Sequence, residues 1–549
     1  GETVAEAAGS EVTAGDIALA ATDSTLRDVF TNGAARTDAT GLAGGVIVDV
    51  YRRDTVARAA DTLLRTLSGD VSLAALSEVD ASTVAIGRNG GQGNVGGQGN
   101  VTWLTDARDV VAEVVDGAID AEGDASLSAR RVDTYLGIQG SDTRSANGLG
   151  IGAGVFRVHG TTAALLRGAS SARTGGDLSL AAENAAELLQ VGLGVTVGGS
   201  FAGVGSLGVV DFGQRPGELP TVTGEDRGRL LREAAAIALN EAAAFVADKA
   251  RVELPEFDFT RPTEILARIE GTGSVDVGGS LALAATDARV ADAIAGQVSL
   301  ALDIGIASQL VDAFSVVRDE DTGKFKVRMR PLLPQQTGED APETEDDERE
   351  QDVSTEAEGP ALFDDLGEVQ ADGQAIAESD GGAGEGGDGG DQGQPISLGI
   401  GVSFARFGGV VGAEIDLGRL SLAKVENSVA VAARSRTDGR AVSVGASFLG
   451  SAIGAGGGVV QQAQLVRARI FGKGTLQAKG ATVTGSSGNR LRGMAGVLSV
   501  TDELAFGGTL GAAELKARSA AEVDEARLIL GTGGLQLDAG DTTKALGLG

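Results

Sequence analysis

Residues that could bind a cation occur together in one Gly/Asp-rich segment of the chain. Residues 386–391, GGDGGD, match the first six positions of a calcium-binding nonapeptide that works in stacked tandem copies. The apolar residue expected at the eighth position is absent, because Gly393 stands there, and the motif occurs once. Asp388 and Asp391 are therefore the candidate calcium ligands. The simpler interpretation is a solvated acidic loop that binds no metal.

Few residues in this chain are suited to enzyme chemistry. The only histidine is His159, and there is no cysteine, so Ser-His-Asp sites, thiolate sites and His-ligated metal sites are nearly excluded. His159 stands beside Gly160 at the end of a Gly/aliphatic segment, which favours a turn residue. A glycosidase would need a specific pair of carboxylates, and the sequence places no such pair. We predict no enzyme activity and no cofactor other than calcium.

The charge distribution excludes further classes of partner. The formal net charge is −32, and between residues 339 and 391 there are 20 acidic residues and one basic residue, Arg349, which gives −19 for that window. Nucleic-acid binding requires a basic stripe, so a nucleic-acid partner is not expected. Adhesion to an anionic membrane surface is disfavoured for the same reason.

A short Gly-initiated motif returns along the chain and indicates a repeat architecture. It starts at Gly15, Gly69, Gly123 and Gly176, at steps of 54, 54 and 53 residues. Related copies start at residues 279, 418, 474 and 533. The second residue of the first four copies is Asp. If the copies stack in register, these Asp residues form a ladder, which would either bind cations or, more simply, accept hydrogen bonds from turn amides.

Alternation of apolar residues assigns the repeated motif to β-strands. Ile17, Leu19 and Ala21 share one face of the first copy, and the other copies follow the same period of two. A second strand type alternates Gly with aliphatic residues, as in GLGIGAGVFRV from residue 148, and a third, as in TTAALLRGASSA from residue 161, contains Thr, Ala and charged residues. These patterns predict an all-β parallel β-helix, or β-solenoid, with about two coils per repeat and a length of roughly 75 Å for eight repeats.

Membrane-spanning structure is not expected from these patterns. Alternating strands that cross a membrane would need aromatic girdles, and the chain has one Trp and two Tyr. The apolar runs are short and interrupted by Gly, so no transmembrane helix is predicted either.

Two insertions interrupt the repeats. Residues 226–249 are rich in Ala, Leu, Arg and Glu, with apolar residues such as Leu231 and Phe245 at helical spacing, so a helix is predicted that covers a side wall or, alternatively, docks a partner. Residues 319–394 hold the acidic block and are predicted to be disordered, with an edge strand in KFKVRMR from Lys324. The predicted boundaries are repeats at 1–212, a helical insertion at 213–267, a repeat at 268–318, the acidic insertion at 319–394 and repeats at 395–549.

The sequence resembles the large bacterial surface adhesins of the filamentous-haemagglutinin type, including autotransporter-like filamentous adhesins. The resemblance consists of the G-D-[IVL]-x-L-x-A strands from Gly15, Gly69 and Gly176 and the Gly/aliphatic strands between them, and it covers most of the chain outside the insertions. It implies a right-handed β-helix shaft, secretion across the envelope and a role in adhesion. The amino-terminal secretion domain of that family is absent here, and the acidic insertion departs from its pattern.

Together these observations predict a structural section of a giant secreted or cell-surface bacterial protein, an adhesin shaft or extracellular filament. A β-helix carbohydrate-binding or carbohydrate-active protein and a calcium-responsive assembly module are the alternatives. The partners expected are a second copy stacked end to end, adjacent segments of the same parent chain, and glycans or proteins of a host or neighbouring cell surface.

Overall fold

The protein is described by a computed structural model that covers residues 1–36, 40–90, 95–213, 263–301, 314–318, 325–329, 395–448, 450–501 and 504–549. The described residues form an all-β structure without helices. Twenty-four strands belong to one parallel sheet, and β17 and β18 form a separate antiparallel pair. Among these residues there is no helix with the length and hydrophobicity needed to cross a membrane.

The strands follow one another along the chain with short connections. The first half contains β1 (Glu2–Ala8), β2 (Glu11–Ala14), β3 (Ile17–Ala35), β4 (Thr40–Tyr51), β5 (Asp54–Ala60), β6 (Leu63–Thr66), β7 (Val71–Gly90), β8 (Val95–Ala107), β9 (Val110–Val115), β10 (Ala118–Ala121), β11 (Ala125–Arg167), β12 (Ser171–Thr174) and β13 (Leu178–Phe212). The second half contains β14 (Thr263–Ile269), β15 (Ser274–Val277), β16 (Leu281–Ala301), β17 (Phe314–Arg318), β18 (Phe325–Met329), β19 (Ile396–Asp416), β20 (Leu422–Val425), β21 (Ser428–Phe448), β22 (Ser451–Phe471), β23 (Thr475–Val500), β24 (Ala505–Leu515), β25 (Arg518–Asp524) and β26 (Arg527–Leu548).

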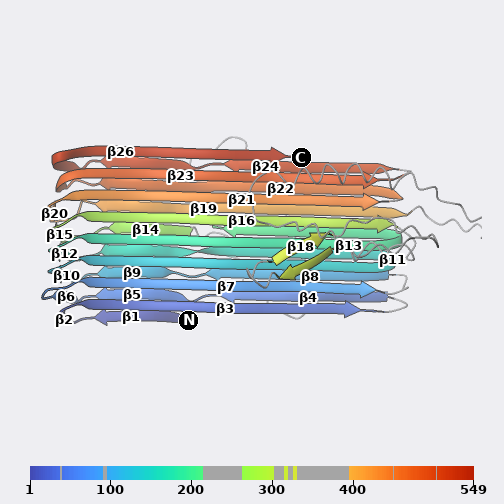
Figure 1. The fold of residues 1–549 in the computed structure, drawn as a ribbon, viewed down its shortest axis with the longest axis horizontal. Helices are drawn as coiled ribbons and strands as arrows, with labels where there is room; N and C mark the ends of the chain where they lie inside the picture. The colour runs from blue at the N-terminus through green and yellow to red at the C-terminus, as the bar shows by residue number, and fades with distance from the viewer. Residues whose placement is uncertain are drawn as a thin grey trace, which may run out of the picture.

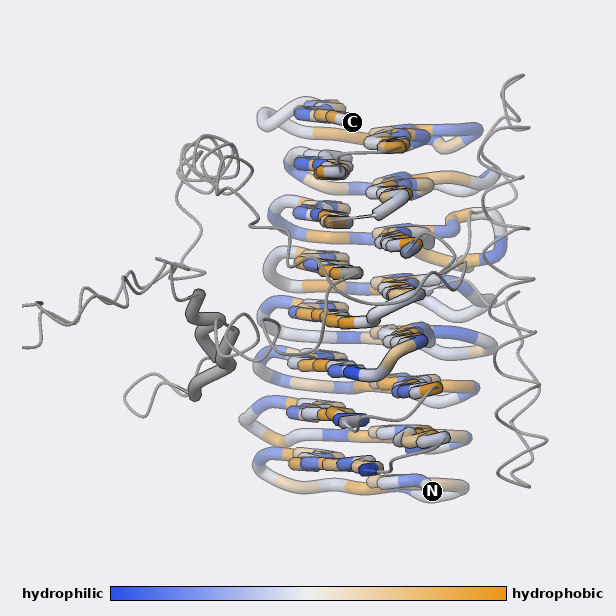
Figure 2. Tube along the Cα trace, turned by 90° about the vertical axis from the view of Figure 1, so that its right-hand side faces the viewer, coloured by the Kyte–Doolittle hydropathy of each residue, from blue (hydrophilic) through white to orange (hydrophobic). Residues whose placement is uncertain are grey.

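Each repeat makes one layer of the stack. Ile17 pairs with Val71, Val71 with Ala125, and Ala125 with Leu178, so one step of about 54 residues returns the chain to the same position one strand higher (Figure 1). The expectation of two coils per repeat was therefore wrong. Figure 2 shows the layers as flattened loops, one above another. Eight layers at the usual strand spacing span about 34 Å, less than half the length expected.

The described strand segments stack into four walls, of which the glycine wall has seven strands and the other three have eight each. The short wall begins each layer (β10, for example), and the long wall follows, with β7 as a representative. The glycine wall comprises β4, β8, 147–159, 201–212, 396–407, 451–462 and β24. The charged wall comprises β1, β5, β9, 161–167, β14, 410–416, 465–471 and β25. The Gly-alternating and Thr/Ala/charged segments distinguished in the sequence are thus strands of the glycine and charged walls.

Two of the predicted repeat starts are displaced. The residue that stacks on Gly279 is Asn427, because the Asn427 N–H donates to the Gly279 carbonyl at 3.0 Å, and Lys479 follows above Asn427. Gly418 and Gly474 instead precede short-wall segments, β20 and the start of β23. Strands of the short wall and of the long wall both begin after a turn, and in both the apolar residues alternate with period two. The motif alone therefore does not distinguish the two walls.

The interior contains two apolar clusters of small and medium side chains. The larger cluster lies among the short wall, the charged wall and the first part of the long wall, and includes Leu73, Leu127, Ile265 and Val431. The smaller one lies between the middle of the long wall and the end of the glycine wall, and stacks Phe212 on Phe407 with ring centroids 5.4 Å apart. Towards the turn that joins these two walls the interior is polar. Buried residues there include Gln98, Asn100, Thr143, Gln190, Thr196, Gln297, Ser299 and Ser443.

Three of the corners where the glycine wall turns into the charged wall contain a glycine with a positive φ. These are Gly160, Gly213 and Gly409, with φ of +133°, +93° and +127°. A Cβ on Gly160 would lie 2.0 Å from the Arg108 carbonyl oxygen of the layer below. The corner therefore permits successive layers to approach closely.

The insertions lie largely outside the described residues. The predicted helix 226–249 and the acidic residues Asp388 and Asp391 belong to this part. The predicted boundaries need correction. β14 begins at Thr263, inside the predicted helical insertion, and the long-wall strand β16 ends at Ala301, before the predicted boundary at residue 318. The KFKVRMR segment is a strand, as expected: β18 pairs with β17 through Phe314 and Met329.

Candidate functional site

The predicted Asp ladder exists at the corner between the short and long walls. Each Asp accepts, through Oδ1, the backbone N–H of the next layer: Asp16 from Asp70 at 3.0 Å, Asp70 from Asp124 at 2.8 Å and Asp124 from Asp177 at 2.7 Å. Asp177 accepts from Ser280 at 2.6 Å. The simpler of the two interpretations, turn amides bonded to the Asp side chains, is confirmed.

A groove of about 570 Å³ follows this ladder. Its lining includes all four Asp residues together with Ser72, Ser126 and Ser179. The four Asp residues are exposed, and the part of the chain that the structure describes contains no group of three or more His, Cys, Asp or Glu residues placed to hold a metal ion. The groove thus provides a row of exposed carboxylates that are already bonded to backbone amides.

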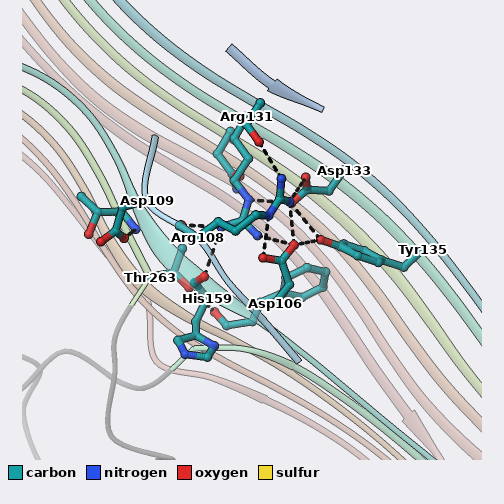
Figure 3. Close-up of polar contacts among 12 residues, drawn as sticks. Asp106, Arg108, Asp109, Arg131, Asp133, Tyr135, His159 and Thr263 are labelled. Carbon is teal, nitrogen blue, oxygen red and sulfur yellow. Dashed lines mark hydrogen bonds and ion pairs between the residues drawn. The ribbon is translucent and has the colours of Figure 1, made fainter. Parts of the chain in front are cut away.

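A second set of polar residues is fully buried between the long and glycine walls (Figure 3). This Arg/Asp cluster consists of Asp106, Arg108, Arg131, Asp133 and Tyr135, none more than 2% exposed. Asp106 is the penultimate residue of β8, near the corner, and Arg108 follows in the turn. The other three occupy alternate positions of β11, so their side chains lie on its inward face together with Leu127.

The cluster pairs two cations with two anions. Arg108 makes a bidentate contact to Asp106, Nε–Oδ1 2.7 Å and Nη2–Oδ2 2.6 Å, and donates to Asp133 at 2.6 Å. Arg131 donates to Asp133 at 2.6 Å and lies 3.1 Å from Asp106. The Tyr135 hydroxyl donates to Asp106. Because charges balance and donors meet acceptors, the cost of burial is largely offset.

Arg131 also binds the backbone at the corner. Its Nη1 donates to the carbonyls of Arg108, at 3.2 Å, and His159, at 3.1 Å, which belong to successive layers. Arg289 repeats this arrangement higher in the stack, where its Nη1 donates to the Phe212 and Gly408 carbonyls, both at 2.9 Å. Buried arginines therefore satisfy carbonyls that the turn leaves without strand partners.

The charged groups of the cluster stabilise one another in their charged forms. Burial alone would raise the pKa of the Asp106 carboxyl, but Arg131 and Arg108 outweigh burial and lower that pKa. Burial, together with Asp106 and Asp133, raises the pKa of Tyr135 well above its usual value of 10.0. Tyr135 therefore remains a neutral hydrogen-bond donor across the ordinary pH range.

The Arg/Asp cluster has the geometry of a structural site. Its polar atoms contact one another, the backbone or the Ser77 hydroxyl, which accepts from Arg108 Nη1 at 2.6 Å, and none of its residues lines the groove beside the Asp ladder. Sequence reasoning missed the cluster. The sequence did contain a signal for it, the alternation of side chains along a strand. Leu127 and Ala129 define the inward face of this strand, and Arg131 and Asp133 are the next two positions on the same face.

His159 is the last residue of the glycine-wall part of β11, where it pairs with Ala107, and Gly160 follows it at the corner. It is thus a strand residue and not the turn residue that the sequence predicted. The side chain is 6% exposed, and its Nδ1 has no hydrogen-bond partner among the described residues. Burial, reinforced by nearby Arg157, lowers the pKa of His159. Among the described residues, no carboxylate contacts the imidazole ring of His159 in the way that a catalytic base requires.

The aromatic side chains that usually stack on sugars are buried. The single Trp, Trp103, is 4% exposed, and the two Tyr residues, Tyr51 and Tyr135, are 7% and 1% exposed. A carbohydrate site built on an exposed Trp or Tyr platform is therefore not available on this chain.

The outer face of the charged wall holds a column in which opposite charges alternate from layer to layer. From bottom to top the stacked residues are Glu6, Arg58, Glu113, Leu165, Arg268, Glu414, Arg469 and Glu522. Glu113 contacts Arg58 at 2.5 Å and Arg167 at 2.8 Å. Glu414, only 2% exposed, contacts Arg467 at 2.7 Å and Arg469 at 3.0 Å. Glu113 and Glu414 thus bind arginines of the layers below and above them, while Leu165 interrupts the column between the two.

Comparisons of the chain with protein-family models, with curated proteins and with solved structures find no match. The functional conclusion therefore depends on the chain's own sequence pattern and geometry.

Proposed function

We propose that this chain is a structural section of a large secreted or cell-surface bacterial protein, in which stacked layers form a right-handed β-solenoid shaft of an adhesin or extracellular filament. The observation on which the proposal depends is the residue-for-residue parallel pairing of successive layers, from Ile17 and Val71 through to Met494 and Leu548. Stacks of this kind transmit load along backbone hydrogen bonds and present long surfaces.

The polar sites of the chain support a scaffold role. The Asp ladder bonds each layer to the next, the Arg/Asp cluster joins backbone carbonyls of two layers, and the charged wall pairs opposite charges across layers. All three act between layers. The sequence resemblance to filamentous adhesins points to the same role and supplies the expected location outside the cell.

The proposal is tested by locating the protein on the cells that make it. Antibodies raised against the purified chain and visualised by immunogold electron microscopy should label filaments or spikes at the cell surface. A control in which the antibody is first absorbed with the purified chain should abolish labelling. Labelling confined to the cell interior would contradict the proposal.

A further inference from the structure

The outer face of the glycine wall, near the turn to the long wall, is apolar and free of charge. Seven rows of four outward positions, 28 in all, contain no Asp, Glu, Lys or Arg. The rows are 40, 42, 44 and 46; 95, 97, 99 and 101; 147, 149, 151 and 153; 201, 203, 205 and 207; 396, 398, 400 and 402; 451, 453, 455 and 457; and 504, 506, 508 and 510. We call this surface the apolar face.

Its large side chains are open to solvent even in the middle of the stack. Leu149, Ile151, Ile400 and Ile453 are 46%, 42%, 43% and 37% exposed. With four positions along each strand and seven layers, the apolar face covers about 900 Å². Monomeric soluble proteins rarely expose a contiguous apolar patch of that size, so the face indicates an interface.

We propose that the apolar face binds the same face of a second copy of this chain, forming a two-fold dimer of packed sheets. The area matches the roughly 800 Å² per partner that a stable protein interface buries. A surface without charges is complementary to another surface without charges, and the chain itself provides one. Two flat sheets pack face to face in this way in β-sandwiches. This inference does not depend on the proposed function.

The relief of the face is complementary to itself. One column reads Gly99, Ile151, Gly205 and Ile400 from layer to layer, so hollows alternate with ridges. A Cβ built on Gly99 would meet nothing within 4 Å, and one on Gly205 would approach only the Ile400 carbonyl oxygen, at 4.0 Å. If two copies pack with an offset of one layer, Ile151 of each copy enters the hollow at Gly99 or Gly205 of the other. Ridge-and-hollow packing of this kind is typical of specific interfaces.

Charge argues against a lipid bilayer as the occupant. The segment that joins Ala301 to Ile396 leaves and re-enters the sheet at the edge of the apolar face, and residues 339–391 within it have a net charge of −19. Ala301 and Ile396, which flank that segment, lie at the edge of the apolar face, so the chain connects an excess of carboxylates to this edge. The penalty for carboxylates in the bilayer makes a protein partner the better match.

Sedimentation velocity of the full chain tests the dimer. We expect a dimer at micromolar concentration, and we expect Ile151→Asp combined with Ile400→Asp to weaken it at least tenfold, because each copy would bury unpaired carboxylates. Val290→Asp is the matched control: Val290 is 42% exposed, like Ile151, but lies on the long wall, so the dimer should persist. Gly99→Leu fills a hollow without adding charge and should also weaken the dimer.

Crosslinking separates face-to-face pairing from end-to-end stacking. The chain has no cysteine, so Gly205→Cys provides a single thiol on the apolar face. A bis-maleimide crosslinker that spans about 10 Å, the usual distance between packed sheets, should yield covalent dimers. End-to-end stacking keeps this mid-stack position of one copy far from that of the next and should yield none. A wild-type chain that stays monomeric at 100 micromolar, a dimer that survives the double Asp variant, or binding of the chain to neutral phosphatidylcholine vesicles that Ile151→Asp abolishes would each overturn the proposal.

Discussion

Asp70 accepts the backbone N–H of Asp124 through its Oδ1 at 2.8 Å, although the two residues are 54 positions apart in the sequence. The same contact joins Asp124 to Asp177 at 2.7 Å. Above Asp177 the stacked residues are Ser280 and Ser428, so the ladder of carboxylates ends halfway up the stack. The lower layers thus have an inter-layer contact that the upper layers lack.

Removal of one Asp from this ladder should lower stability modestly. Asp124→Ala deletes the acceptor for the Asp177 amide at an exposed corner, and we expect a loss of about 1 kcal/mol in the free energy of unfolding, measured by urea denaturation. Asp124→Asn retains an acceptor oxygen and should lose less. Asp80→Ala, an exposed substitution on the long wall, is the control. Equal effects of Asp124→Ala and Asp80→Ala would show that the ladder contact adds nothing.

The Arg/Asp cluster should be far more sensitive. Arg131→Met leaves Asp133 and Asp106 buried with one cation between them and frees two carbonyls, so we expect a loss of about 3 to 5 kcal/mol in unfolding free energy. Asp133→Leu alone should be similarly costly. The double variant keeps the cluster neutral and should be more stable than the sum of the two losses predicts. Strict additivity in this double-mutant cycle would contradict the coupling described here.

The charged wall offers a matched pair of ion-pair variants. Glu414→Gln removes a charge that is 2% exposed and contacts three arginines, and we expect it to cost about 2 kcal/mol in urea unfolding. Glu183→Gln breaks an exposed pair with Arg130 at 3.5 Å and should cost less than about 0.5 kcal/mol. If the two variants unfold at the same urea concentration, burial of Glu414 does not strengthen its contacts.

His159 should make stability depend on pH as the pH falls below its unfolded pKa of 6.5. Its pKa in the folded protein is lowered by burial, so the unfolded chain takes up a proton near pH 6.5 that the folded chain resists. Stability from this group is present above pH 6.5 and is lost as pH falls towards the folded pKa. His159→Gln should flatten the dependence of the urea midpoint on pH in this window. Since His159 is the only histidine, an unchanged slope would assign the effect to other groups.

The alternation of residues by itself determined the local structure of this protein. Ile17, Leu19 and Ala21 on one face predict a strand wherever they occur, and the return of Gly-Asp every 54 residues predicts a stack whose corner Asp residues bond turn amides. These features are local, because side-chain parity and turn chemistry depend on a few neighbouring residues. The all-β class and the strand in KFKVRMR followed from the same signals.

Only the tertiary structure decided how many coils one repeat makes, and which residues meet. Parity tells which face a residue occupies but not which strand lies above it, so one coil of 54 residues and two shorter coils share the same pattern. Arg108 meets Asp133, 25 residues away, and Glu414 meets Arg469, 55 residues away, because the walls bring them together. The apolar face likewise emerges only when rows of Gly, Leu and Ile from seven separate layers are stacked in register.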